Sequence, residues 1–98
     1  MAVTYEQARE IIRERFEPGW THGTFCLDDR VITENDEFYV FSIGAREFII
    51  DGDFNYMIAG GVPLVAKSDG RIESRASVDV AMDTTMRRHP NPNPTLTV

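Results

Sequence analysis

Apolar residues in the first part of the chain recur with the period of an α-helix. They stand three and four positions apart, at Tyr5, Ala8, Ile11, Ile12 and Phe16. Thr4 and Gln7 have the spacing of a capping box, in which each side chain bonds the backbone N–H of the other residue. Pro18-Gly19 marks the end of the helix. The pattern predicts an amphipathic helix of about three turns that packs one side on a sheet.

The most apolar and aromatic stretch, residues 37–50, predicts the centre of an antiparallel sheet. Its side chains alternate between two apolar faces, one with Tyr39, Phe41 and Ile43 and the other with Phe38 and Val40. Apolar residues on both faces favour an inner strand. Gly44 predicts a bend, after which residues 47–50 continue the strand or begin another.

Further strands are predicted on either side of this stretch. Residues 24–33 form a first strand whose middle, Asp28-Asp29-Arg30, predicts a bulge or a split into two strands. Residues 62–67 predict a strand with Pro63 near its start or on an edge. Ser68-Asp69-Gly70 is a hairpin signal, because glycine supplies the positive φ of the turn, and residues 71–74 form the return strand.

Residues 76–88 fit two patterns. The alternation of residues 72–82 favours a long strand. A helix is favoured by Ser77 as a cap and by Val78, Met82 and Met86 on one face. Between these alternatives we predict the helix.

The prolines at alternate positions in residues 90–98 prevent regular hydrogen bonding and predict a flexible C-terminal tail. Residues 1–89 then form a single α+β domain. Its N-terminal helix packs on one face of an antiparallel sheet of three to five strands, followed by a short C-terminal helix.

The size and composition of the chain point to one hydrophobic core. Ninety-eight residues with 42% apolar content suffice for a single globular domain. Cys26 has no second cysteine to pair with, which excludes an intrachain disulfide and is typical of a reducing compartment. The charged N-terminal residues lack the apolar core of a signal peptide, and no apolar run reaches the length of a membrane span. We expect a cytoplasmic protein that does not enter the membrane.

The net charge of −6 is concentrated in residues 28–53. The favoured interpretation is that these charges keep strand edges and turns soluble. The alternative is an acidic face that attracts a basic protein partner. The candidate partner-binding residues are Asp28, Asp29, Glu34, Asp36, Glu37, Asp51 and Asp53. Nucleic acid is not expected as a partner, because phosphate contacts need clustered lysine and arginine.

Two short stretches imitate sites without completing them. Asp51-Gly52-Asp53 begins like a calcium-binding EF-hand loop, but Tyr56 and Val62 replace its glycine and its bidentate glutamate, so a polar turn is favoured. His22 and Cys26 stand four apart without a third orienting residue, so a buried structural cysteine is favoured over a nucleophile. We expect no enzymatic activity, no metal site and no cofactor.

Four aromatic residues offer a candidate ligand pocket between helix and sheet: Tyr5, Trp20, Tyr39 and Tyr56. Aromatic residues in such positions are more often part of the core.

Residues 59–72 resemble a known family. The run Ala59-Gly60-Gly61-Val62-Pro63-Leu64-Val65, followed by Lys67, Gly70 and Ile72, resembles the closing hairpin of the YrhB-like small bacterial proteins, which are grouped with immunity protein family 35. The order of elements over residues 4–88 is similar as well. The resemblance implies a non-enzymatic protein that neutralises a cognate toxin by binding it or acts as a small heat-stable chaperone. No catalytic residue is carried over.

Together these observations predict a small cytosolic, non-enzymatic protein-binding domain, of immunity or chaperone type, that acts through an acidic and aromatic surface. The alternative is an α+β domain that binds a small ligand. We expect a monomer or a weak homodimer.

Overall fold

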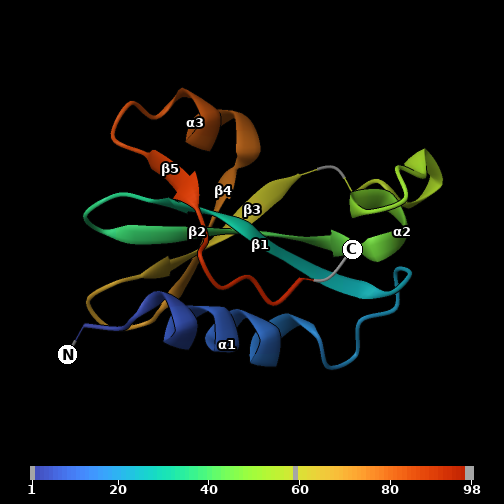
Figure 1. Ribbon diagram of the computed structural model, residues 1–98, viewed down its shortest axis with the longest axis horizontal. Coiled ribbons are helices and arrows are strands. Elements are labelled where there is room, and N and C mark those ends of the chain that lie inside the picture. The colour runs from blue at the N-terminus through green and yellow to red at the C-terminus, as the bar shows by residue number, and fades with distance from the viewer. Residues whose placement is uncertain (1, 59, 97–98) are drawn as a thin grey trace.

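The computed structural model describes residues 2–58 and 60–96 and has an α+β architecture (Figure 1). The elements follow in the order α1 (Tyr5–Phe16), β1 (Phe25–Glu34), β2 (Phe38–Ala45), α2 (Arg46–Ile49), the 3₁₀ turn η1 (Phe54–Tyr56), β3 (Gly61–Ala66), β4 (Ile72–Ala76), α3 (Ser77–Met82) and β5 (Arg87–Pro90). The strands form one antiparallel sheet in the order β4-β3-β2-β1-β5. The predicted α+β class is confirmed.

Helix α1 begins with the predicted capping box. The Gln7 amide donates to Thr4 Oγ1 at 3.1 Å, and the Thr4 amide donates to Gln7 Oε1 at 2.9 Å. The apolar stripe of the helix lies on the sheet, where Tyr5 stacks on Phe41 with 5.2 Å between ring centroids. The main core between helix and sheet consists of Tyr5, Ala8, Ile12, Leu27, Ile32, Phe41 and Val65.

Strand β2 is the middle strand of the sheet, as its two apolar faces predict. Its residues Tyr39, Phe41 and Ile43 belong to the α1 side. Phe38 and Val40 belong to a second, smaller cluster on the opposite side, which α3 covers through Val80. The sheet therefore has α1 on one face and the short helix α3 over part of the other (Figure 1).

The irregularity predicted in the first strand is a wide bulge in β1. Asp28 pairs with Ser42 and Thr33 pairs with Val40, so residues 29–32 stand opposite the one β2 residue between those partners. The bulge turns the carboxylate of Asp29 toward α1, whose Arg9 it meets. It also lets the later part of β1 pair with β5.

The segment after β2 differs from the prediction, because residues 46–49 form the helix α2 and not a strand. Glu47 accounts for the change of direction: its carboxylate accepts hydrogen bonds from the amide and the hydroxyl of Thr24, both at 3.0 Å. Gly44 stays within β2, and Ile49 packs so closely on it that an added Cβ would lie 3.3 Å from Ile49 Cδ1.

The C-terminal helix is shorter than predicted and exposes a different face. It ends at Met82, because the carboxylate of Asp83 accepts from the amide and hydroxyl of Thr85 and turns the chain. Val78 and Met82 are 64% and 76% exposed, whereas Val80 is buried. Residues 87–90, predicted to end the helix and begin the tail, form β5 beside β1.

Candidate functional site

The predicted acidic residues are spread over three places. Asp28 and Asp29 lie in the β1 bulge; Glu34, Asp36 and Glu37 lie at the β1–β2 turn; Asp51 and Asp53 lie between α2 and η1, beyond the opposite end of β2. Most of them already have partners within the chain. They therefore do not form the single acidic face that the sequence suggested.

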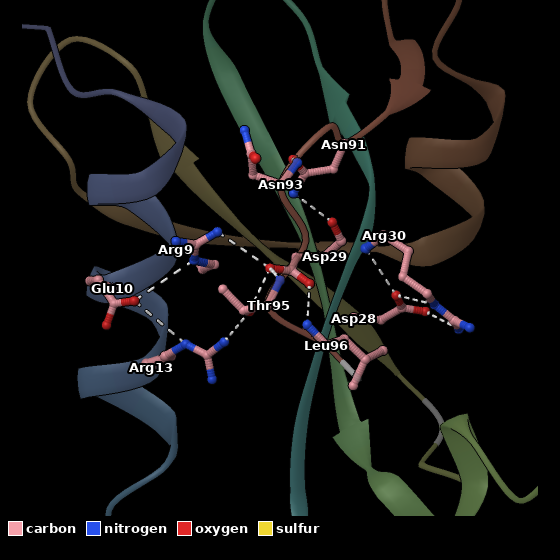
Figure 2. Close-up of polar contacts among 10 residues, drawn as sticks. All are labelled: Arg9, Glu10, Arg13, Asp28, Asp29, Arg30, Asn91, Asn93, Thr95 and Leu96. Carbon is pink, nitrogen blue, oxygen red and sulfur yellow. Dashed lines mark hydrogen bonds and ion pairs between the residues drawn. The ribbon is translucent and has the colours of Figure 1, made fainter. Parts of the chain in front are cut away.

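Asp29 cannot contact a partner in this structure, because it is fully buried. Its carboxylate accepts hydrogen bonds from the Thr95 amide at 2.8 Å, the Thr95 hydroxyl at 2.6 Å and the Leu96 amide at 3.0 Å (Figure 2). From the other side Arg9 Nη1 approaches it at 3.3 Å, and Arg13 donates to the Thr95 hydroxyl at 2.7 Å. The C-terminal segment thus covers the bulge and closes the site around Asp29.

The same segment satisfies the backbone of the bulge. The amide of Asn91 donates to the carbonyl of Arg30 at 3.0 Å, and the Asn91 side chain donates to the carbonyl of Asp29 at 2.7 Å. These are the groups that a bulge withdraws from the strand ladder. The predicted flexibility of residues 90–98 stays a prediction, and residues 97 and 98 lie outside the described part of the chain. The hydrogen bonds that Asn91, Thr95 and Leu96 donate to the bulge would have to break before the C-terminal segment could leave it.

The electrostatics of the remaining acidic residues follow from their partners. Hydrogen bonds from Arg30 hold the pKa of Asp28 below its ordinary value. Hydrogen bonds from Lys67, at 2.6 Å, and from His89, at 2.8 Å, lower the pKa of Glu34. The carboxylates are therefore kept charged and paired, which is the state of structural ion pairs and not of a general acid.

The four aromatic residues of the predicted ligand pocket lie in two places. Tyr5 and Tyr39 pack edge to face near the start of α1, with 5.6 Å between ring centroids. Burial raises the pKa of Tyr5 to about 12. Trp20 and Tyr56 lie beyond the other end of α1, where Trp20 packs on Phe25 and Tyr56 on His22.

Trp20 is part of an apolar surface that sequence reasoning missed. Four residues from two distant segments form it, and we call it the Trp20 patch: Phe16, Trp20, Met57 and Ile58. Met57 and Ile58 are 53% and 50% exposed, and the guanidinium of Arg15 lies over the Phe16 ring at 5.3 Å. The C-terminal end of α1 and the α2–η1 segment lie at the same end of the molecule (Figure 1).

The Trp20 patch lies between two shallow hollows. One, of about 610 Å³, runs from Phe16 to His22 and Met57. The other, of about 490 Å³, runs from Phe16 and Trp20 to Pro63 and Ile72 near β4. Trp20 is held in place by its indole N–H, which donates to the carbonyl of His22 at 2.7 Å. A tryptophan that lines two neighbouring hollows is a geometry that suits an inserted side chain of another protein.

A groove of about 390 Å³ lies on the opposite face of the sheet, between β1, β2 and α3. Its apolar lining includes Val31, Val40, Val62 and Val80. Arg88 of β5 is at its rim, and the Arg88 side chain has no hydrogen bond or ion pair with a described residue. The six-residue helix α3 borders the groove through Ser77, Val80 and Ala81.

The residues considered for metal or nucleophilic chemistry have structural roles. Asp53 accepts a hydrogen bond from the Asn55 amide and caps η1, as expected for a polar turn. Cys26 is buried in β1, and burial raises the pKa of its thiol, which disfavours the nucleophilic thiolate. His22 bonds the carbonyl of Tyr56 at 3.0 Å. Within residues 2–58 and 60–96, no cluster of three or more His, Cys, Asp or Glu has a metal-binding arrangement.

The described helices include none with the length and apolarity needed to cross a membrane. Comparisons of the chain with protein-family models, with curated proteins and with solved structures found no match in any of the three.

Proposed function

We propose that this chain is a non-enzymatic protein-binding domain of the cytoplasm that contacts its partner through the Trp20 patch. One observation supports this most directly: Met57 and Ile58 are about half exposed and line a hollow together with Trp20, which also lines a second hollow. Tryptophan, methionine and arginine are enriched where proteins bind one another. An exposed group of apolar residues around them is typical of an interaction site.

The acidic residues have a smaller part in this proposal than the sequence suggested. Asp51 is exposed in the loop after α2, at the same end of the molecule as the Trp20 patch. If the partner is basic, Asp51 adds a salt-dependent contribution at the rim, where charges act mainly on the association rate. The apolar contacts of the patch supply the affinity.

Tryptophan fluorescence gives a direct test, because Trp20 is the sole tryptophan of the chain. A partner is identified by crosslinking in the native cell and then purified, and its binding is measured by calorimetry and by the emission of Trp20. Met57→Asp should weaken binding at least tenfold, since it places a charge in a desolvated contact. Met82→Asp is the matched control: Met82 is an exposed methionine on α3, far from the patch, and should change little.

Equal loss in both variants, or binding that leaves the Trp20 emission unchanged, would refute the assignment of the patch. The immunity and chaperone forms of the proposal separate in a second assay. An immunity-type protein forms a stoichiometric complex with one toxin and neutralises it. A chaperone-type protein suppresses the aggregation of unrelated clients at elevated temperature, and that activity should also fall in Met57→Asp.

The groove beside α3 favours a second candidate function, the binding of a small carboxylate with an apolar body. Its valine lining suits the body, and the unpaired guanidinium of Arg88 suits the carboxylate. Octanoate is a suitable probe in an NMR titration. Shifts confined to the groove that disappear in Arg88→Gln would support this function, and the absence of shifts at millimolar octanoate would exclude it.

A further inference from the structure

In the described part of the chain the outer strands of the sheet are β4 and β5, and β4 is the less protected of the two. At the other edge, β5 ends at Pro90, which has no N–H to donate. Self-pairing of β5 would also bring Arg87 and Arg88 together with their copies. Like charges across a strand pair are destabilising, so this edge is protected.

The register of β4 with β3 determines which β4 backbone groups face outward. The Ala66 amide donates to the carbonyl of Arg71 at 2.9 Å, so Ala66 and Arg71 form a hydrogen-bonded pair. From there, non-hydrogen-bonded and hydrogen-bonded pairs alternate along the two strands. Glu73 is then bonded to Leu64, and Ser74 stands opposite Pro63 in an unbonded pair. Pro63 has no N–H, which agrees with this assignment. The N–H and C=O of Ser74 therefore face away from β3, at the open edge of the sheet.

We infer that β4 is a dimerisation edge, at which a second copy of this chain adds its β4 antiparallel and centred on Ser74. In this register the N–H of each Ser74 donates to the carbonyl of Ser74 in the other copy. Glu73 then lies opposite Arg75 of the copy, in an unbonded pair where side chains are closest. Two-fold symmetry forms this pair of opposite charges twice.

The side chains on the other face of β4 agree with the same register. Ile72 lies on the α1 side of the sheet, where it packs against the main core, and Ser74 and Ala76 share that side by alternation. In the dimer Ile72 meets Ala76 of the copy, and Ser74 meets itself. Every facing pair is thus either apolar, polar or oppositely charged.

The charged side chains of β4 are partly exposed, and Glu73 also pairs with Arg71 of its own chain at 2.8 Å. The side chains of Glu73 and Arg75 are 36% and 35% exposed. Arg75 is held in the monomer only by a long ion pair with Asp83, at 3.8 Å, and by its position over the Phe38 ring. A five-residue strand buries less area than a permanent dimer needs, so the association is concentration-dependent. The strand pairing uses no residue of the Trp20 patch, although Ile72, Glu73 and Ser74 also line the second hollow beside that patch.

Sedimentation equilibrium of the full chain tests the inference, with the mass expected to rise from 11.1 kDa toward twice that value with concentration. Glu73→Arg places like charges across the strand pair and should raise the dissociation constant roughly tenfold or more. The double variant Glu73→Arg/Arg75→Glu restores opposite charges and should restore the dimer. High salt should weaken the wild-type dimer.

Ser74→Pro is a second variant that leaves the monomer intact, because the Ser74 amide is not used by β3. It removes the central donor of the proposed edge and should abolish the dimer, while circular dichroism shows an unchanged fold. A mass that stays at 11.1 kDa up to millimolar concentration would overturn the inference. So would a dimer that is insensitive to Ser74→Pro, or a double charge exchange that fails to restore what the single variant lost.

Discussion

Replacing Asp29 by alanine should destabilise the protein strongly, although the sequence made Asp29 a candidate partner-binding residue. The substitution removes the acceptor of three hydrogen bonds of 2.6–3.0 Å from residues 95 and 96. It also leaves Arg9, whose side chain is only 12% exposed, without its carboxylate at 3.3 Å. The C-terminal segment loses the group that holds it on the bulge.

The magnitude follows from the burial of the pair. Removing one member of a buried ion pair costs about 3–5 kcal/mol. The amides of Thr95 and Leu96 can regain water if the segment detaches, so we expect about 3 kcal/mol for Asp29→Ala. In a domain of this size that loss lowers the melting temperature by about 12–24 °C. It is a large part of a total stability of about 5–15 kcal/mol.

Urea unfolding of Asp29→Ala measures this loss, and Asp28→Ala is the matched control. Asp28 is the neighbouring residue in β1, but its partner Arg30 is 43% exposed, so the loss of that pair should cost much less than the loss of Asp29. Amide exchange gives a local readout: the amides of Thr95 and Leu96 should lose protection in Asp29→Ala and keep it in Asp28→Ala. A loss below 1 kcal/mol, or one equal to the control, would refute the role given to Asp29.

Acid should remove the contribution of Asp29 as well. Burial raises the pKa of Asp29, but hydrogen bonds from Thr95 and Leu96 and the charge of Arg9 lower it by more, so the folded-state pKa lies below the ordinary value. The stabilisation that the Asp29 carboxylate provides is full above the unfolded-state pKa of about 3.9 and is lost as pH falls through the folded-state pKa. The difference in unfolding free energy between wild type and Asp29→Asn should therefore narrow in acid. A difference that stays constant with pH would contradict this. Gly23→Ala should cost about 2–3 kcal/mol in urea unfolding, since φ is +68° and a Cβ would lie 2.8 Å from a glutamate oxygen of α2. Gly19→Ala is the control and should cost about 1 kcal/mol, because Gly19 has a φ of +77° but open space around it. Equal losses in the two variants would exclude the steric cause. Phe41→Ala should cost about 3–5 kcal/mol by the same measurement, because Phe41 is 2% exposed at the centre of the core, and a loss below 2 kcal/mol would place the core elsewhere.

The elements that the sequence predicted correctly are those specified by local patterns. Helix α1 follows from its apolar period and its capping box, which involve residues within four positions of one another. The central place of β2 follows from apolar residues on both faces. The hairpin turn follows from Gly70, whose φ of +78° few other residues adopt. Such signals depend on neighbours along the chain, so they survive without knowledge of the fold.

The candidate site depended on contacts between distant residues, which a local pattern does not contain. Trp20 lines the same hollow as Met57 and Ile58 because the chain after η1 lies near the C-terminal end of α1. The exposed loop residues there carry no period that would have identified them. The apolar dipeptide 57–58, in a loop where polar residues are usual, was the one available signal.

Charge was the property for which sequence and structure differed most. The sequence determined that residues 28–53 are acidic, and this alone suggested a surface for a basic partner. The tertiary structure decided that Asp29 is buried under residues 91–96 and that Glu34 is paired with Lys67 and His89. The physical reason is that the partners of a charge are set by long-range packing, whereas the number of charges is set by composition. A charged residue in a predicted bulge is therefore as open to a structural role as to a binding one.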